Sequence, residues 1–253
     1  MNSKFIKWGN GKKTLIFLHC FGGNANDWKW VADEISADFT CIAMHLPGFG
    51  NNESFVAPSI LNVALNIKAV INKIGVRKYS LIGHSMGGKI ALQLAAIDKK
   101  RAIKNLILIS PSPPGVESIS PEKKLQLLRV PSKSIALEFV NSLTAKPLKG
   151  IKLENAINAQ LTTTKFVRHW WVNKGSQQSI INQLKKIKCP ITVLSSKSDK
   201  AIDFSIIKDK VIPLLKRRKL IEVKNSGHLY PLEIPGIIAK QIENTFLELD
   251  RKG

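Results

Sequence analysis

The sequence predicts an α/β fold in which a mainly parallel sheet is covered by helices on both faces. Three observations support this prediction. Apolar runs rich in β-branched residues alternate with segments of helical length, as in parallel sheets that are buried on both sides. The sequence Gly-His-Ser-Met-Gly at residues 83–87 lies between an apolar run and a helical run of small residues. The stretch 112–186 breaks the alternation and contains only helical patterns.

Six apolar runs are expected to form the parallel strands of the core. A further strand, residues 4–8, is expected at one edge of the sheet as part of an antiparallel hairpin that returns through residues 9–11 to Lys12. The six parallel runs are residues 14–19, 39–46, 79–83, 106–110, 191–195 and 220–223.

Capping residues mark several helix starts. Asn24 or Asn26 is placed to cap a helix that begins near Asp27, and Pro231 suits the first turn of the last helix. Ser120 and Ser132 are plausible starts for helices within the inserted stretch. We therefore predict an α/β core made of residues 1–111 and 187–253, with a helical lid at 112–186 inserted into it.

Composition narrows the class of protein. A chain of 253 residues is long enough for one large core. No apolar window is long enough to span a membrane and the first residues lack an apolar leader, so a cytoplasmic location is expected. Cys20, Cys41 and Cys189 are scattered and odd in number, which predicts reduced thiols and neither a disulfide framework nor a metal site.

Three side chains at the carboxyl ends of predicted strands have the chemistry needed for acyl transfer. Ser85 at the centre of the 83–87 sequence is the candidate nucleophile, since a strained turn between small residues exposes its hydroxyl. His228 follows the strand at 220–223 and is the candidate base. Asp199 follows the strand at 191–195 and is the candidate acid, with Asp203 as the competing residue. All three belong to the sheet edge where open α/β folds place their sites.

At this point the chain resembles the α/β-hydrolase family. The order Ser85, Asp199, His228 matches that family's order of nucleophile, acid and base, and residues 18–23 and 46–50 resemble its His-Gly-x and Pro-Gly-x-Gly loops. The resemblance implies an oxyanion hole made by the backbone N–H groups of Met86 and Phe21. The sequence departs from the family's usual pattern at three positions: Cys20, where Gly is usual, His45, where Asp is common, and Ser196, where Gly often stands.

An aromatic stripe lies in the predicted lid. Phe166, Trp170 and Trp171 occur at helical spacing and form either core packing or part of the roof over Ser85. We expect one tryptophan of this stripe, Trp170, to line the substrate pocket.

The net charge of +21 is unevenly distributed along the chain. Every basic run precedes a predicted strand, so these runs should gather at the edge of the sheet opposite Ser85. One interpretation is that these basic runs keep the protein soluble and complement helix dipoles. The alternative is that they form a surface, on the side opposite Ser85, that docks an acidic protein, nucleic acid or an anionic membrane. The loops at residues 20–26, 46–57 and 111–116, each of which follows a predicted strand, contain no Lys or Arg, which predicts a nearly neutral catalytic mouth. The basic runs are residues 12–13, 77–78, 99–101, 185–188 and 216–219.

These observations predict a serine hydrolase of the carboxylesterase type. We expect it to cleave an ester, or a thioester, of an apolar acyl group through an acyl-enzyme and without a cofactor or metal. Carbon–carbon bond hydrolases and perhydrolases use the same triad and stay open as alternatives, as does a ligand-sensing receptor with little turnover. An acidic partner such as an acyl carrier protein is a further prediction, and nucleic acid is not expected as a partner.

Overall fold

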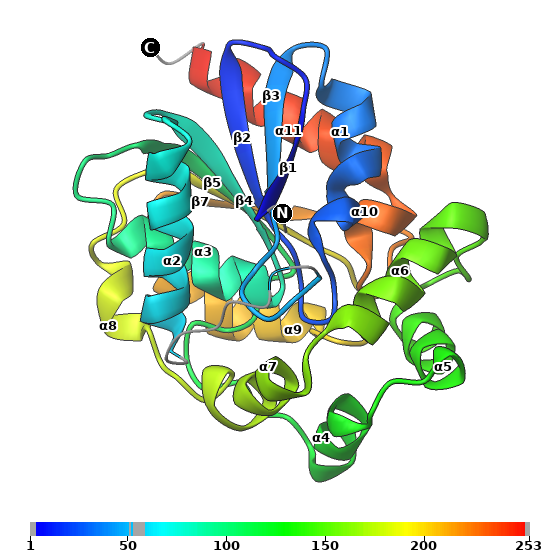
Figure 1. Cartoon of the computed structure of the whole chain (residues 1–253). Coiled ribbons are helices and arrows are strands. Elements are labelled where there is room, and N and C mark those ends of the chain that lie inside the picture. The colour runs from blue at the N-terminus through cyan, green and yellow to red at the C-terminus, as the bar shows by residue number, and fades with distance from the viewer. Residues whose placement is uncertain (1–3, 51, 53–58, 251–253) are drawn as a thin grey trace.

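The computed structural model describes residues 4–50, 52 and 59–250, and within these it contains one seven-stranded sheet. The strand order is β1-β3-β2-β4-β5-β6-β7, and every neighbouring pair is parallel except β1 with β3 (Figure 1). The strands are β1 Phe5–Trp8, β2 Lys13–Leu18, β3 Phe39–Met44, β4 Tyr79–His84, β5 Ile103–Ile109, β6 Ile191–Ser195 and β7 Arg218–Glu222. All seven predicted strands are therefore present.

The pairing of the first strand differs from the prediction. β1 is an antiparallel edge strand, but its partner is β3 and not β2. The turn between β1 and β2 crosses the start of β3, and its glycines lie tightly against that backbone: a Cβ on Gly9 would lie 2.2 Å from the carbonyl oxygen of Ser36, and one on Gly11 would lie 1.9 Å from that of Asp38. The glycines that indicated a hairpin instead allow the chain to pass over a neighbouring strand.

Helices bury both faces of the sheet. One face packs against α2 (Ile60–Lys73) and α3 (Met86–Ala96), and the other against α1 (Lys29–Ile35) and α11 (Pro235–Asp250). Alternate residues of β2 divide between the two cores, with Ile16 in the first and Phe17 in the second. The remaining elements of the core are η1 Ala25–Trp28, α9 Phe204–Ile206, η3 Ile207–Val211, η4 Ile212–Leu214 and α10 Tyr230–Glu233.

The capping predictions are mostly confirmed. Asn24 caps η1 by accepting a hydrogen bond from the backbone N–H of Asn26, and Ser120 and Ser132 cap two helices of the inserted stretch. Pro231 lies in the short α10, while the last helix begins at Pro235. The prediction that Pro231 lies in the first turn of the last helix was therefore wrong: Pro231 belongs to the short helix before it.

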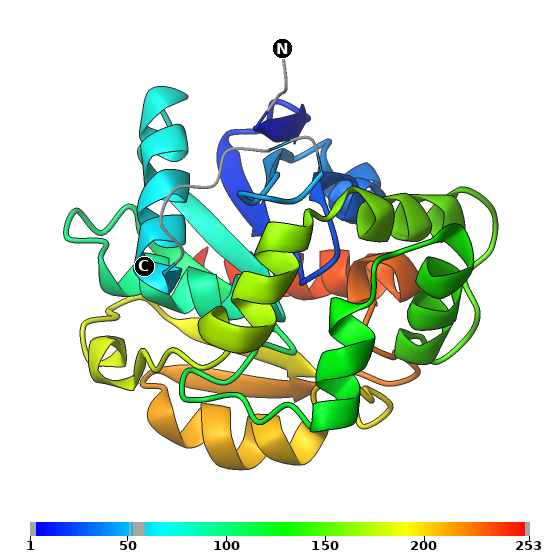
Figure 2. The same ribbon diagram turned by 60° about the horizontal axis from the view of Figure 1, so that its bottom comes forward.

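Between β5 and β6 the chain forms only helices, which lie over the carboxyl edge of the sheet (Figure 2). These helices are α4 Pro121–Leu128, α5 Lys133–Leu143, α6 Gly150–Thr162, α7 Lys165–Trp170, the π-helix η2 Trp171–Gly175 and α8 Ile181–Leu184. Among the described helices, none is both long and apolar enough to cross a membrane.

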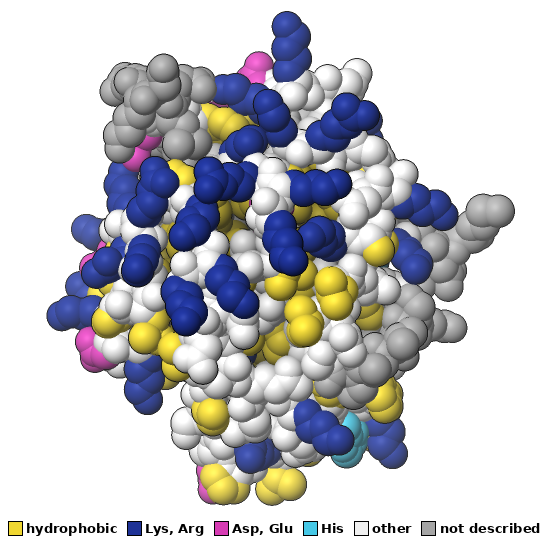
Figure 3. All heavy atoms as spheres, turned by 90° about the vertical axis from the view of Figure 1, so that its left-hand side faces the viewer, with side chains coloured by type: hydrophobic (Ala, Val, Ile, Leu, Met, Phe, Trp, Pro, Cys, Tyr) yellow, Lys and Arg dark blue, Asp and Glu magenta, His cyan; other side chains and the backbone are white. Residues whose placement is uncertain are grey.

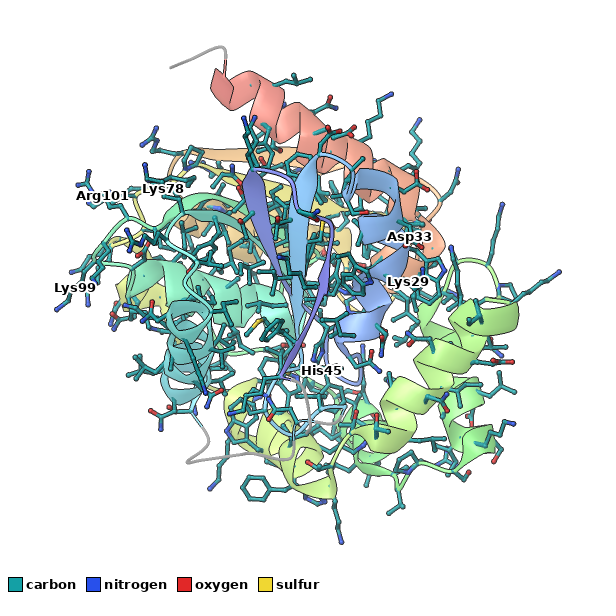
Figure 4. The ribbon with its side chains drawn as sticks, turned by 45° about the horizontal axis from the view of Figure 1, so that its top comes forward. Lys29, Asp33, His45, Lys78, Lys99 and Arg101 are labelled. Carbon is teal, nitrogen blue, oxygen red and sulfur yellow. The ribbon has the colours of Figure 1, made fainter. Side chains whose placement is uncertain are left out.

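Basic side chains gather at the amino ends of β5, β6 and β7. Figure 3 shows this side of the molecule, where Lys and Arg far outnumber Asp and Glu, and Figure 4 shows Lys78, Lys99 and Arg101 projecting from it. The runs that precede strands in the sequence therefore meet in space, as predicted. One hollow on this side is lined by Asp98 and by Arg101, Lys104, Lys185, Lys186, Lys188, Lys216 and Arg217.

Candidate active site

Ser85 lies on a strained turn between β4 and α3. Its φ of 53° and ψ of −117° are rarely adopted by a residue with a side chain. The flanking glycines make this turn possible: a Cβ on Gly83 would lie 2.6 Å from the carbonyl oxygen of Gly87, and one on Gly87 would lie 2.5 Å from that of His19. The spacing of the 83–87 sequence therefore follows from the close packing of the turn against the strands.

Asp199 and His228 form a buried hydrogen-bonded pair. Asp199 follows β6 and His228 follows β7, and 2.8 Å separates Asp199 Oδ2 from His228 Nδ1. The backbone N–H of His228 donates to the carbonyl oxygen of Leu143, which fixes the histidine loop against α5. Asp203, the competing acid, instead caps α9 through the N–H of Ser205.

Asp199 is held as a carboxylate by its surroundings. Although burial favours the neutral acid, the attraction of His228 and several hydrogen bonds outweigh it and keep the pKa of Asp199 well below its usual range. Ser110 Oγ and Tyr230 OH donate to Oδ2 at 2.6 and 3.2 Å, and the N–H of Ala201 donates to Oδ1 at 2.8 Å. An ionised acid beside Nδ1 orients the imidazole so that Nε2 is available as a base.

Ser85 and His228 line one cavity, about 840 Å³ in volume including its opening to solvent. No hydrogen bond joins the Ser85 hydroxyl to the His228 ring within the described part of the chain, a common arrangement in unliganded sites. Most of the lining is apolar, and it comes from the core loops and the inserted helices. The apolar lining residues are Phe21, Pro113, Val116, Ile119, Leu127, Phe139, Leu143, Trp171, Ala201, Ile202 and Ile206.

The backbone N–H groups of Phe21 and Met86 have no acceptor among the residues that the structure describes. Met86 opens α3 directly after Ser85, so its N–H belongs to the unpaired first turn of a helix. Phe21 follows Cys20, and the residue of this loop in left-handed backbone is Gly22. The Cβ of Cys20 is therefore compatible with the loop, and its side chain packs with Val140 and Leu229 under the inserted helices.

The other two departures from the family pattern have structural roles. The N–H of Ser196 donates to the Tyr230 hydroxyl, and Ser196 Oγ accepts from the N–H of Ser198, so both groups stabilise the turn that carries Asp199. His45 accepts a long hydrogen bond of 3.5 Å from the N–H of Ala25.

Two histidines near the site are neutral scaffold groups. Burial lowers the pKa of His19 to about 3, and its ring bridges the carbonyl of Cys20 and the N–H of Leu46. Burial, with a smaller effect from His228, lowers the pKa of His84 well below its usual value. Burial also raises the pKa of the Cys20 thiol, so this cysteine lacks the thiolate needed for nucleophilic attack.

The structure places Trp171, and not Trp170, in the cavity wall. Trp170 is buried in the main core. Both tryptophans pack so closely against Gly175 that a side chain there would collide with them. Helical spacing identified the aromatic stripe but did not show which of the two adjacent tryptophans faces the cavity.

The prediction of a nearly neutral mouth is wrong. The loops after β2 and β5 contain no Lys or Arg, as expected, and residues 51 and 53–57 of the loop 46–57, which also lacks Lys and Arg, lie outside the described residues. However, Glu117, Lys123 and Lys210 also line the cavity. They come from the inserted stretch and from η3, whose position over the site could not be read from the order of the strands.

Two residues that support Asp199 were missed from the sequence. Ser110 ends β5 at the same sheet edge as Ser85, and Tyr230 stands two residues after His228. Their positions were available from the sequence, but only the hydrogen bonds to Asp199 show what they do.

A serine on a strand-to-helix elbow, with an Asp and His pair after two later parallel strands, defines the α/β-hydrolase class of fold. In agreement, residues 13–133 match the family model described as "alpha/beta hydrolase fold". The chain therefore has the α/β-hydrolase fold that this family model describes.

Comparison with individual proteins gives partial and full-length matches. A "Dihydrolipoyllysine-residue acetyltransferase component of acetoin cleaving system" from Cupriavidus necator is 31% identical over 109 residues, which are 43% of this chain and only 29% of that protein. The "2-succinyl-6-hydroxy-2,4-cyclohexadiene-1-carboxylate synthase" of Serratia proteamaculans is 23% identical over 254 residues and 96% of both chains. A solved structure of a bacterial "membrane phospholipase A" is 25% identical, with a TM-score of 0.82 over 98% of this chain and 83% of that one.

Proposed function

We propose that the protein is a serine hydrolase that cleaves a carboxylic ester, or a thioester, of an apolar acyl group. The observation that carries the proposal is that the strained Ser85 and the buried Asp199–His228 pair reach one largely apolar cavity. The inserted helices act as a lid over this cavity. The likeness to a structure named as a phospholipase supports ester chemistry on an apolar acyl chain.

In the proposed mechanism His228 Nε2 takes the Ser85 proton as Oγ attacks the carbonyl carbon. Asp199 holds the imidazole and stabilises its protonated form, while the N–H groups of Met86 and Phe21 bind the oxyanion. His228 then returns the proton to the departing alcohol or thiol and leaves an acyl group on Ser85. A water molecule activated by His228 releases the acid. Only groups of this chain and water take part.

Pre-steady-state hydrolysis of p-nitrophenyl esters tests this mechanism. Mixing the enzyme with p-nitrophenyl butyrate should release a burst of p-nitrophenol close to one equivalent per active site, because this activated ester acylates Ser85 faster than water hydrolyses the acyl-enzyme. Ser85→Ala should abolish both the burst and the steady-state rate. Wild-type turnover by Ser85→Ala would contradict the proposal.

Chain-length profiling then separates the alternatives. Ester hydrolysis that improves with acyl length supports the esterase assignment. A protein that reacts with a fluorophosphonate but hydrolyses no ester in the series would instead support a carbon–carbon bond hydrolase or a perhydrolase, and ligand binding without turnover would support a receptor.

A further inference from the structure

Three ionisable side chains line the cavity and take no part in the proposed mechanism. Lys123 lies on α4, Lys210 on η3, and Glu117 on the segment between β5 and α4. The rest of the cavity wall is mostly apolar, apart from serines and His228. A substrate in this cavity therefore lies beside ionisable side chains, and the binding of an apolar acyl chain alone does not explain why they are there.

The ammonium of Lys123 is available to a ligand. Its Nζ donates one hydrogen bond, at 3.2 Å, to the carbonyl oxygen of Ala201, which also lines the cavity. An ammonium has three donors, and no carboxylate lies within ion-pair distance of Lys123 or Lys210 in the described part of the chain. Both side chains therefore bring to the cavity a positive charge that no ion pair within the described residues neutralises.

Glu117 supplies a hydrogen-bonding group that lacks a partner. Its Oε2 is buried without a hydrogen bond to any described residue, while its backbone is fixed by bonds to Ser176 and Gln177. Burial raises the pKa of Glu117, against the opposing effects of a hydrogen bond from Ser112 and of the positive charges of Lys89 and Lys123. A buried polar atom without a partner is unusual in a finished core and ordinary in a binding site.

A third lysine near the cavity is already committed to the fold. Lys89 is fully buried on α3, and its Nζ donates to the carbonyl oxygens of Gly115 and Ser176 at 2.8 and 3.0 Å. These bonds fasten both sides of the inserted stretch to the core. Lys89 does not line the cavity, so it is not one of the ionisable side chains in its wall.

We propose that Lys123 and Lys210 form a subsite for an ionised carboxylate that the substrate carries at a distance from its ester. The two ammonium groups attract the carboxylate and donate hydrogen bonds to it. The preferred substrate is then a half-ester of a dicarboxylic acid, with an apolar chain between the ester and the free acid. This inference rests on the proposed ester hydrolysis and deepens it.

Matched substrates test the subsite. We would compare kcat/KM for p-nitrophenyl esters of monocarboxylic acids with kcat/KM for mono-p-nitrophenyl esters of dicarboxylic acids, over a series of equal chain lengths. The wild type should prefer the acidic ester at its best length, and added salt should weaken that preference. Lys123→Gln and Lys210→Gln should each lower the acidic-to-neutral ratio by about 2- to 5-fold, the range expected for exposed ion pairs.

Neighbouring lysines provide controls. Lys124 on α4 and Lys208 on η3 do not line the cavity, so Lys124→Gln and Lys208→Gln should leave the ratio unchanged. If Lys123 only fastens α4 to the loop after Asp199, Lys123→Gln will slow both esters equally. An unchanged ratio in Lys123→Gln and Lys210→Gln, or a wild type without acidic preference at any length, would overturn the subsite.

A binding measurement keeps the subsite testable if ester hydrolysis itself fails. Calorimetry on Ser85→Ala with a monoalkyl and a dialkyl ester of the same dicarboxylic acid should show tighter binding of the charged monoalkyl ester. Adding Lys123→Gln should remove that difference. Equal affinities would reject the subsite, whereas a wild type that releases no p-nitrophenol above the uncatalysed rate would reject the proposed hydrolysis.

Discussion

Replacing Asp199 by Asn removes the charge beside His228 and keeps the shape of the side chain. Oδ2 of Asp199 accepts from Ser110 and Tyr230 as well as facing His228 Nδ1, and Oδ1 accepts from backbone N–H groups. An amide has a single acceptor oxygen. One of these two sets of donors must therefore face an NH₂ group in Asp199→Asn.

The expected loss of rate follows from this geometry. Two unit charges about 4 Å apart attract by ~4 kcal/mol at the effective dielectric constant of ~20 that suits protein sites, and about 4 kcal/mol is roughly a 10³-fold change in rate. Losing the correct imidazole tautomer adds to this, and the corresponding Asp→Asn change in serine proteases costs about 10⁴-fold. We expect kcat for Asp199→Asn to fall by about 10³- to 10⁴-fold.

Steady-state hydrolysis of p-nitrophenyl butyrate at saturating substrate measures this loss, with circular dichroism to show that the variant is folded. Asp203→Asn is the matched control because Asp203 is exposed and only caps α9; its kcat should stay within about twofold of the wild type. The reasoning would be refuted if folded Asp199→Asn kept more than about a tenth of the wild-type kcat, or if Asp203→Asn lost as much.

Three further predictions concern the residues around the triad. Gly87→Ala should lower the free energy of unfolding by about 3 kcal/mol or more, because its Cβ would lie 2.5 Å from the carbonyl oxygen of His19, whereas Gly236→Ala, with its nearest atom at 4.0 Å, should be nearly neutral in the same thermal melts. Burial raises the pKa of Asp27 to about 7 from 3.8, so the folded state favours its protonated form: the resulting stability is complete below pH ~4 and is lost as pH rises toward 7. In urea unfolding, the stability of wild type relative to Asp27→Asn should therefore fall by roughly 4 kcal/mol between pH 4 and 8, and a constant difference would contradict the assignment. Cys20→Ala should keep the rate of ester hydrolysis within about threefold of the wild type, since the buried thiol only packs against the inserted helices. Loss of the p-nitrophenol burst in this variant would show that Cys20 takes part in the chemistry.

The sequence predicted the sheet and the placing of Ser85, Asp199 and His228 at one of its edges, because both depend on local signals. Apolar β-branched runs identified the six parallel strands, a glycine turn indicated the edge strand β1, and Asp199 and His228 could be placed because residues after parallel strands meet at one sheet edge. The partner of β1 depended on a glycine turn that carries the chain across β3, and a turn motif alone does not show which strand it passes.

The cavity wall was less predictable for a related reason. Its side chains come from the inserted helices, whose placement is set by packing and by buried bonds such as those of Lys89. Helical spacing alone did not show which of Trp170 and Trp171 faces the cavity, and the folding of α4 and η3 over the site brought Lys123 and Lys210 to a mouth expected to be neutral.

The most direct test of the central claim is covalent labelling of the folded protein with a fluorophosphonate, followed by peptide mass mapping. We expect one adduct per chain, located on Ser85. This adduct should be absent in Ser85→Ala, and it should form much more slowly in Asp199→Asn. A folded wild-type protein that forms no adduct, or that carries it on a residue other than Ser85, would contradict the assignment of Ser85 as an activated nucleophile.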